Sequence, residues 1–151
     1  MDVNSINQKI VSYRTNKDTE DYIIEEFFDE VGEDIINLGE LDRSQKEQLI
    51  ISLFTFLKNQ DSELDECFTF IHLIENIDKP SYEIYYKELF NFNNLNGTIT
   101  SVFLLNRFIN SLSGEEFNKC IHLLKSISDN VNYTASVRTG AQDYYEHQMA
   151  K

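Results

Sequence analysis

The sequence contains few of the residues that define several special classes of protein. Its 151 residues include one proline, five glycines, two cysteines and no tryptophan. This composition excludes collagen-like chains, disordered chains rich in proline and glycine, and small scaffolds held together by disulfides. Cys67 and Cys120 lie in apolar segments and form no CxxC motif, so we expect reduced, buried thiols in a cytoplasmic protein.

Basic residues are also scarce. The chain has 13 Lys and Arg against 26 Asp and Glu, which gives a formal charge of -13. Such a chain lacks the basic surface that phosphate groups require, so we expect no direct binding of nucleic acid. Residues 1–78 hold 19 acids and 6 bases, whereas residues 79–151 hold 7 of each. The acid excess is therefore confined to the first half.

Long apolar runs are missing as well. The longest, residues 49–57, includes Ser52 and Thr55, whereas a membrane-spanning helix needs about 20 apolar residues. Residues 1–13 lack the apolar segment of a signal peptide. We therefore predict no membrane association and a cytoplasmic location.

Apolar residues recur at helical spacing along most of the chain, and its length suits one domain with its own core. We predict an all-α fold, in which a single compact domain, residues 1–128, contains about six to seven antiparallel helices. A polar tail, residues 129–151, would follow and hold at most one loosely packed helix. The spacing places the helices before residue 16 and over about 19–37, 43–59, 61–77, 82–90, 98–112 and 113–127.

Two sequence signals mark where helices begin. Ser44-x-x-Glu47 and Ser113-x-x-Glu116 have the spacing of a capping box. In this motif the first side chain accepts the backbone N–H three residues later, and the second side chain accepts the backbone N–H of the first residue. We predict a helix start at each.

Two parts of the sequence are alike. Residues 69–77 align with residues 119–127, and residues 53–62 align with residues 104–113. A repeated pair of helices of this length resembles the helical hairpins of HEAT and armadillo-type solenoids. It implies two hairpins, 43–77 and 98–127, stacked on an N-terminal helix pair. Because amphipathic helices also match by chance, a compact bundle without repeats is the alternative.

The helix predicted over residues 19–37 has two opposite faces. One face is apolar, and the other carries Tyr22, Glu26, Asp29, Glu30 and Glu33. Like charges one helical turn apart destabilise a helix by about 0.2–0.5 kcal/mol per pair. One interpretation is an unpaired acidic surface that binds a basic protein partner, with Tyr22 as an aromatic anchor. A solvated face that aids solubility is the other.

Tyr82, Tyr85 and Tyr86 form a second candidate binding surface. Tyr85 and Tyr86 are neighbours that diverge by about 100° on a helix, so the three side chains cannot all face one core. The segment Ile84-Tyr85-Tyr86 resembles the paired tyrosines in the recognition helix of colicin nuclease immunity proteins, over three residues. The resemblance implies that both tyrosines contact a partner. Tyrosines half-buried between packed helices are the alternative.

Three pairs of acids lie one helical turn apart. They are Glu30 with Glu33, Glu63 with Glu66, and Glu75 with Asp78. The spacing is similar to the ExxE and ExxD motifs with which all-α nucleotide pyrophosphohydrolases bind Mg²⁺. The gaps between the pairs depart from that pattern, and no Lys or Arg accompanies them to bind a triphosphate.

No nucleotide-binding loop, nucleophile motif or Cys/His metal-ligand spacing occurs in the sequence. We therefore predict a protein without catalytic residues, cofactor or metal. The acidic chain looks like the immunity proteins that neutralise bacterial toxins, which are often cationic nucleases. We expect an immunity-type inhibitor that blocks the active or substrate-binding surface of a basic partner. The alternatives are a Mg²⁺-dependent nucleotide pyrophosphohydrolase and a helical-repeat adaptor.

Overall fold

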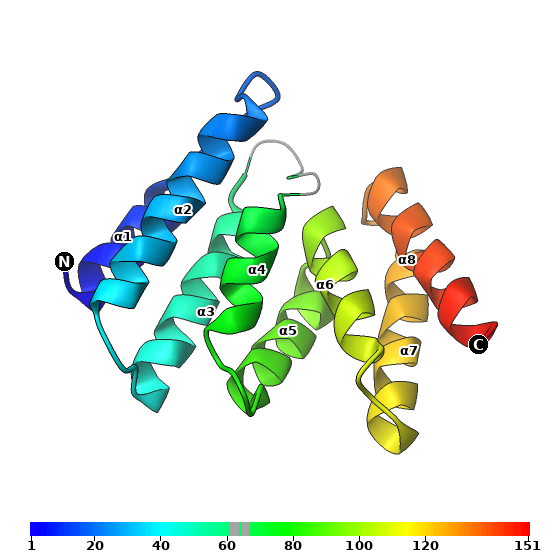
Figure 1. The fold of residues 1–151 in the computed structure, drawn as a ribbon. Coiled ribbons are helices and arrows are strands. Elements are labelled where there is room, and N and C mark those ends of the chain that lie inside the picture. Colours follow the sequence, from blue (N-terminus) through cyan, green and yellow to red (C-terminus); the bar gives the residue numbers. More distant parts are fainter. Residues whose placement is uncertain (61–63, 65–66) are drawn as a thin grey trace. The chain divides into compact units, whose positions relative to one another are not determined.

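The computed structural model describes residues 1–60, 64 and 67–151, which form eight helices and no strand (Figure 1). The all-α prediction is confirmed, with one helix more than the predicted six to seven. The helices are α1 (Val3–Ser12), α2 (Asp21–Asn37), α3 (Arg43–Lys58), α4 (Phe68–Asn76), α5 (Glu83–Leu95), α6 (Ile99–Ile109), α7 (Gly114–Asp129) and α8 (Ala135–Met149).

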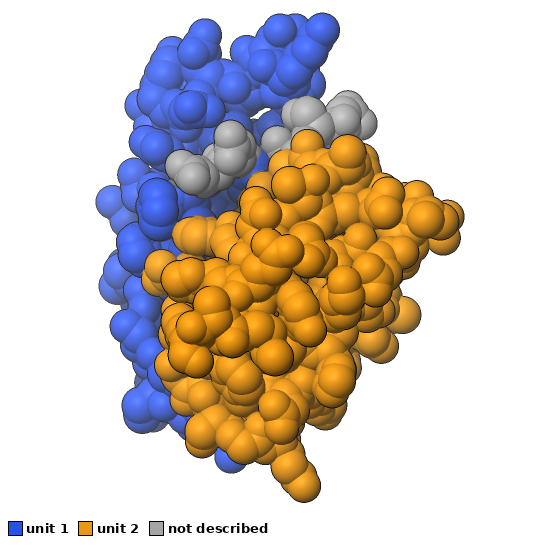
Figure 2. Space-filling model, turned by 90° about the vertical axis from the view of Figure 1, so that its right-hand side faces the viewer, with its two compact units in different colours: residues 1–88 blue, residues 89–151 orange. Residues whose placement is uncertain are grey.

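The chain divides into two compact units, residues 1–88 and residues 89–151, which Figure 2 shows in separate colours. The boundary falls within α5, so that helix contributes its first residues to the first unit and its last to the second. Residues 129–151, predicted as a tail, belong to the second unit.

The first unit is built from helices packed in two layers. Helix α1 packs on α3, α2 packs on α4, and α1 also contacts α2 (Figure 1). Helices α3 and α4 therefore stack on the N-terminal pair α1 and α2, as the sequence predicts. Aromatic rings connect three of these helices, because the ring of Phe28 in α2 lies 4.9 Å from that of Phe56 in α3 and 5.1 Å from that of Phe70 in α4.

Helix α3 starts with a different capping box from the predicted one. The Asp42 carboxylate accepts the backbone N–H of Gln45 at 2.8 Å, and the Gln45 side chain accepts the backbone N–H of Asp42 at 3.0 Å. The prediction of a box at Ser44 and Glu47 is wrong because the chain turns helical two residues earlier. Asp is as good an N-cap as Ser, and sequence spacing alone does not choose between the two.

In the second unit, α6 packs on α7 and α8, and α7 packs on α8. A buried polar cluster fixes the turn before α6. Asn93 donates to the carbonyl oxygens of Leu89 and Ser101, and the Ser101 hydroxyl donates to Asn93 Oδ1 at 2.8 Å. The Thr98 side chain caps α6 in a capping box with Ser101.

Helix α8 begins at Ala135 and extends to Met149, so it occupies most of the segment predicted as a polar tail. The Thr134 hydroxyl accepts the N–H of Val137, and Val137, Ala141 and Gln148 are buried against the rest of the unit. These three residues share one helix face. Because Ala141 is small and Gln148 is polar, the face shows little of the apolar periodicity by which a helix is recognised in a sequence. Residues 135–149 are thus packed rather than loosely attached.

Ser113 is the N-cap residue of α7, as predicted, but its side chain makes no capping hydrogen bond.

The two stretches proposed as repeats lie in helices of unequal length. Helix α3 has 16 residues and α6 has 11, whereas α4 has 9 and α7 has 16. The similarity is therefore confined to the aligned residues and does not extend to the helix ends.

Candidate protein-binding surface

The acidic face of α2 consists of Tyr22, Glu26, Asp29, Glu30 and Glu33, and all five side chains are exposed. The opposite side of the helix holds it in the core, where Phe28 and Val31 are at most 1 % exposed. At 3.6 residues per turn, the three- and four-residue steps of the buried positions direct the acids outward. The structure therefore places this part of the predicted site together on one surface.

Lys9 of α1 neutralises one edge of this face. Its Nζ lies 2.7 Å from Glu30 Oε1 and 3.0 Å from Asp34 Oδ2. Burial disfavours the charged ammonium, but the hydrogen bonds that it donates to Glu30 and Asp34, together with their negative charges, outweigh that effect and raise the pKa of Lys9. The prediction of an unpaired surface is thus wrong for Glu30, whose charge already helps to join α1 to α2.

The other three acids of the face, Glu26, Asp29 and Glu33, have no cation within salt-bridge distance among the described residues. Glu26 and Asp29 are three residues apart, and Asp29 and Glu33 are four apart, so these three acids form two repulsive pairs. The last turn of α2 contains no basic residue to interact favourably with the helix dipole. The helix therefore bears acids that its own stability does not require.

Exposed apolar side chains stand near both ends of the acidic face. Tyr22 in the first turn is 59 % exposed, and Ile36 in the last is 76 % exposed. On a helical wheel Ile36 points in nearly the same direction as Asp29. Sequence reasoning missed Ile36, although its seven-residue separation from Asp29 could have shown that it lies outside the apolar stripe.

The prediction of Tyr85 as a surface residue is wrong. Tyr85 is 1 % exposed, and its ring centroid lies 6.5 Å from that of Phe54. Tyr86 is half-buried. Helix α2 packs against α1 and α4, whereas both tyrosines lie on α5, so the structure gives no reason to join Tyr86 to the acidic face.

Asp78 explains why α5 turns Tyr85 into the core. Its carboxylate is buried, and Oδ2 accepts the N–H groups of Ile84 at 2.7 Å and Tyr85 at 3.0 Å. Lys46 Nζ lies 3.9 Å from the other oxygen. Asp78 therefore holds the first turn of α5, and this use of the carboxylate argues against the proposed Glu75 and Asp78 metal pair.

The remaining acid pairs are Glu30 with Glu33 and Glu63 with Glu66. Glu30 is bound to Lys9, and Glu63 and Glu66 lie outside the described residues. Within residues 1–60, 64 and 67–151, no group of three or more His, Cys, Asp or Glu side chains is placed to hold a metal ion.

Comparison of the chain with known proteins gives no relative. No family model, curated protein or solved structure matches it. Among the described residues, no helix is both long and apolar enough to cross a bilayer. The candidate site therefore depends on the geometry of this chain alone.

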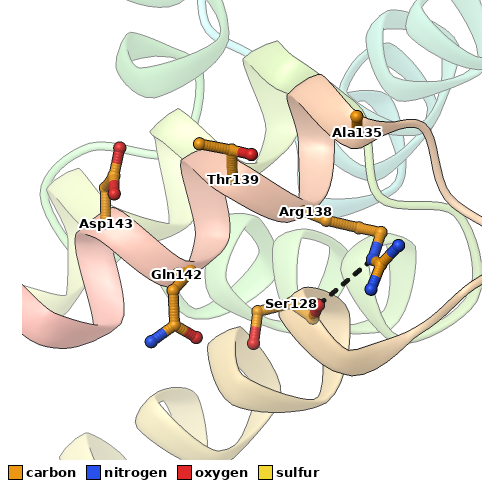
Figure 3. A pocket seen from close by; sticks show the side chains of 6 residues that line it. All are labelled: Ser128, Ala135, Arg138, Thr139, Gln142 and Asp143. Carbon is orange, nitrogen blue, oxygen red and sulfur yellow. Dashed lines mark hydrogen bonds between the residues drawn. The ribbon is translucent and has the colours of Figure 1, made fainter.

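Sequence reasoning also missed an open hollow of about 350 Å³ between the end of α7 and the start of α8 (Figure 3). Arg138 reaches across it, and its Nε donates to the Ser128 carbonyl at 3.3 Å. The lining residues are Ser128, Ala135, Arg138, Thr139, Gln142 and Asp143. Arg138 satisfies a carbonyl at the end of α7, which gives it a structural role.

Proposed function

We propose that this protein is a non-catalytic binding protein that uses the acidic face of α2 to bind a basic protein. One observation carries the proposal: Glu26, Asp29 and Glu33 are exposed together and have no cationic partner among the described residues. The repulsion between them is relieved when a partner supplies the missing positive charges. A surface kept only for solubility does not require its acids on one face of one helix.

The mechanism combines long-range attraction with short-range contact. Grouped charges of one sign attract an oppositely charged partner and raise the association rate, an effect that salt screens over about 8 Å at physiological ionic strength. Tyr22 and Ile36 provide apolar surface that a partner can cover after encounter. Covered aromatic and aliphatic side chains slow dissociation, so the acids set the association rate and these two residues set the lifetime.

An immunity-type inhibitor is the specific form of this function that we propose. A nuclease binds nucleic acid through a basic surface, and carboxylates one helical turn apart offer that surface a substitute for phosphates. A toxin nuclease covered in this way cannot bind its substrate. The strong acidity of residues 1–78 supports this form, since it opposes the charge of such a partner.

The test compares two variants of equal net charge. Glu26→Gln, Asp29→Asn and Glu33→Gln together neutralise the acidic face, and Glu115→Gln, Asp143→Asn and Glu146→Gln neutralise three exposed acids of the second unit. Immobilised wild-type protein and both variants are exposed to the host proteome, and proteins retained by the wild type are identified and purified. Association rates are then measured over a range of salt concentrations.

We expect a cationic partner that associates about tenfold more slowly with the α2 variant at low salt, with rates that converge at high salt. The control variant should behave like the wild type. If the partner is a nuclease, wild-type protein should suppress cleavage of nucleic acid and the α2 variant should do so only at higher concentration. Equal association with both variants would contradict the role of α2, and a partner without nuclease activity would contradict the immunity function alone.

A further inference from the structure

Asn96 and Gly97 form the connection between α5 and α6, and both residues are half-buried. Gly97 has no Cβ to keep its backbone nitrogen away from the preceding side chain. An Asn amide carbon followed by such a nitrogen is open to attack within the chain, because the two atoms belong to neighbouring residues and a five-membered ring can close. The turn is therefore a candidate for spontaneous covalent modification.

Tyr133 contacts the backbone nitrogen of Gly97, the atom that would attack the Asn96 amide. The Gly97 N–H donates a hydrogen bond of 3.0 Å to the Tyr133 hydroxyl. The ring lies over the glycine, because a Cβ built at Gly97 would be 3.4 Å from Tyr133 Cζ. Burial raises the pKa of Tyr133, so its hydroxyl stays neutral and does not act as a phenolate base toward the Gly97 N–H.

We propose that Asn96 is a site of deamidation through a succinimide, and that the Tyr133 hydroxyl sets the rate. Solvent base removes the Gly97 amide proton, the nitrogen bonds to Asn96 Cγ, and the Cγ–Nδ2 bond breaks. The amide nitrogen leaves as ammonia after taking a proton from solvent. Water then opens the ring at either carbonyl and gives aspartate or isoaspartate at position 96.

The two products affect α6 differently. Position 96 directly follows the last residue of α5, whose dipole disfavours a carboxylate, and lies two residues before Thr98, the N-cap of α6, whose dipole favours one. The two effects oppose each other, and aspartate keeps the length of the main chain, so it leaves the entry to α6 unchanged. Isoaspartate adds a methylene to the main chain, which displaces the Gly97 N–H from Tyr133 and alters the entry to α6.

The test incubates wild-type protein and Tyr133→Phe in heavy-oxygen water at mildly alkaline pH, below the unfolding temperature of both. Digestion and mass spectrometry then follow the peptide that contains Asn96. We expect the mass gain of deamidation with one heavy oxygen incorporated, in both aspartate and isoaspartate forms. Loss of the hydrogen bond to the nitrogen should make the reaction about fivefold faster in the Phe variant.

Two controls separate the chemistry from unfolding. Asn94 is exposed but lies within α5 and precedes Leu95, so fragmentation of the peptide should place the mass gain at Asn96 and none at Asn94. In urea the two proteins should react at equal rates, because the folded contact no longer exists. An Asn96 that reacts only in urea would overturn the modification site, and equal rates in the two native proteins would overturn the role of Tyr133.

Discussion

Leu73 Cδ1 of α4 lies 3.8 Å from the point that a Cβ on Gly32 of α2 would occupy. This is ordinary van der Waals contact, and Gly32 has no positive φ that requires a glycine. Gly32→Ala should therefore stabilise the protein by about 1 kcal/mol, because alanine has the higher helix propensity and restricts the unfolded chain. Urea denaturation measures the change, and a decrease in stability would show that α2 and α4 pack more closely than described.

The contact of Lys9 with Glu30 and Asp34 should contribute about 1 kcal/mol, because Lys9 and Asp34 are partly shielded while Glu30 is 65 % exposed. Lys9→Met keeps much of the apolar stem and removes the charge. We expect a loss of this size in the free energy of unfolding. Asp34→Asn alone and combined with Lys9→Met completes a double-mutant cycle, whose coupling energy should vanish if the residues do not interact.

The pH dependence of this contact has a defined sign. The pKa of Lys9 is raised in the folded state above its ordinary value of 10.5, so the folded protein binds the proton more tightly than the unfolded chain. The stabilisation is complete below the unfolded pKa and is lost as pH rises through the folded pKa. Denaturation of wild type and Lys9→Met from pH 7 to pH 11 should show a constant difference that shrinks only in the most alkaline samples.

Removal of the Asp78 carboxylate should destabilise the first unit. Asp78→Ala leaves two buried N–H groups at the start of α5 without their acceptor, which costs about 2–3 kcal/mol. Asp78→Asn retains one oxygen that can accept and should lose roughly half as much. Chemical denaturation of both variants measures this, with Glu40→Gln, an exposed acid, as the comparison. Equal stability of the Ala and Asn variants would exclude the capping role.

The buried pair Asn93 and Ser101 should show strong coupling. Ser101→Ala leaves Asn93 Oδ1 without the hydroxyl that donates to it, and Asn93→Leu removes donors to two carbonyl oxygens. Each change should cost about 1–3 kcal/mol, and the double variant should cost less than the sum because both remove the same hydrogen bond. Additive losses in urea denaturation would show that the pair does not act as a unit.

Strong helical periodicity predicted α2 and α3 closely. The sequence placed them over 19–37 and 43–59, and the structure has Asp21–Asn37 and Arg43–Lys58. The buried residues of α2 are large and apolar, so the sequence also predicts which residues lie on the opposite, exposed face of the helix. Helix α8 was missed in part because only Val137 among its buried residues is large and apolar, and the β-branched residues near its start favour a strand.

The candidate site was predicted in part for the same reason. The acids of α2 lie opposite a clear apolar stripe, so their exposure could be inferred from spacing. Their pairing could not, because Lys9 reaches Glu30 from another helix and no local pattern signals such a contact. Tyr85 was misplaced because the spacing shows that Tyr85 and Tyr86 point in different directions but not which of the two faces the core, where Tyr85 is 1 % exposed.

The division of α2 into two faces also affects how the protein can change over generations. Phe28 and Val31 maintain the fold and lie on the buried face. The acids Glu26, Asp29 and Glu33 lie on the opposite, exposed face. A substitution on the outer face alters what the surface attracts without opening a cavity in the core. Substitutions can therefore accumulate on the outer face while the stability of the helix pair is preserved.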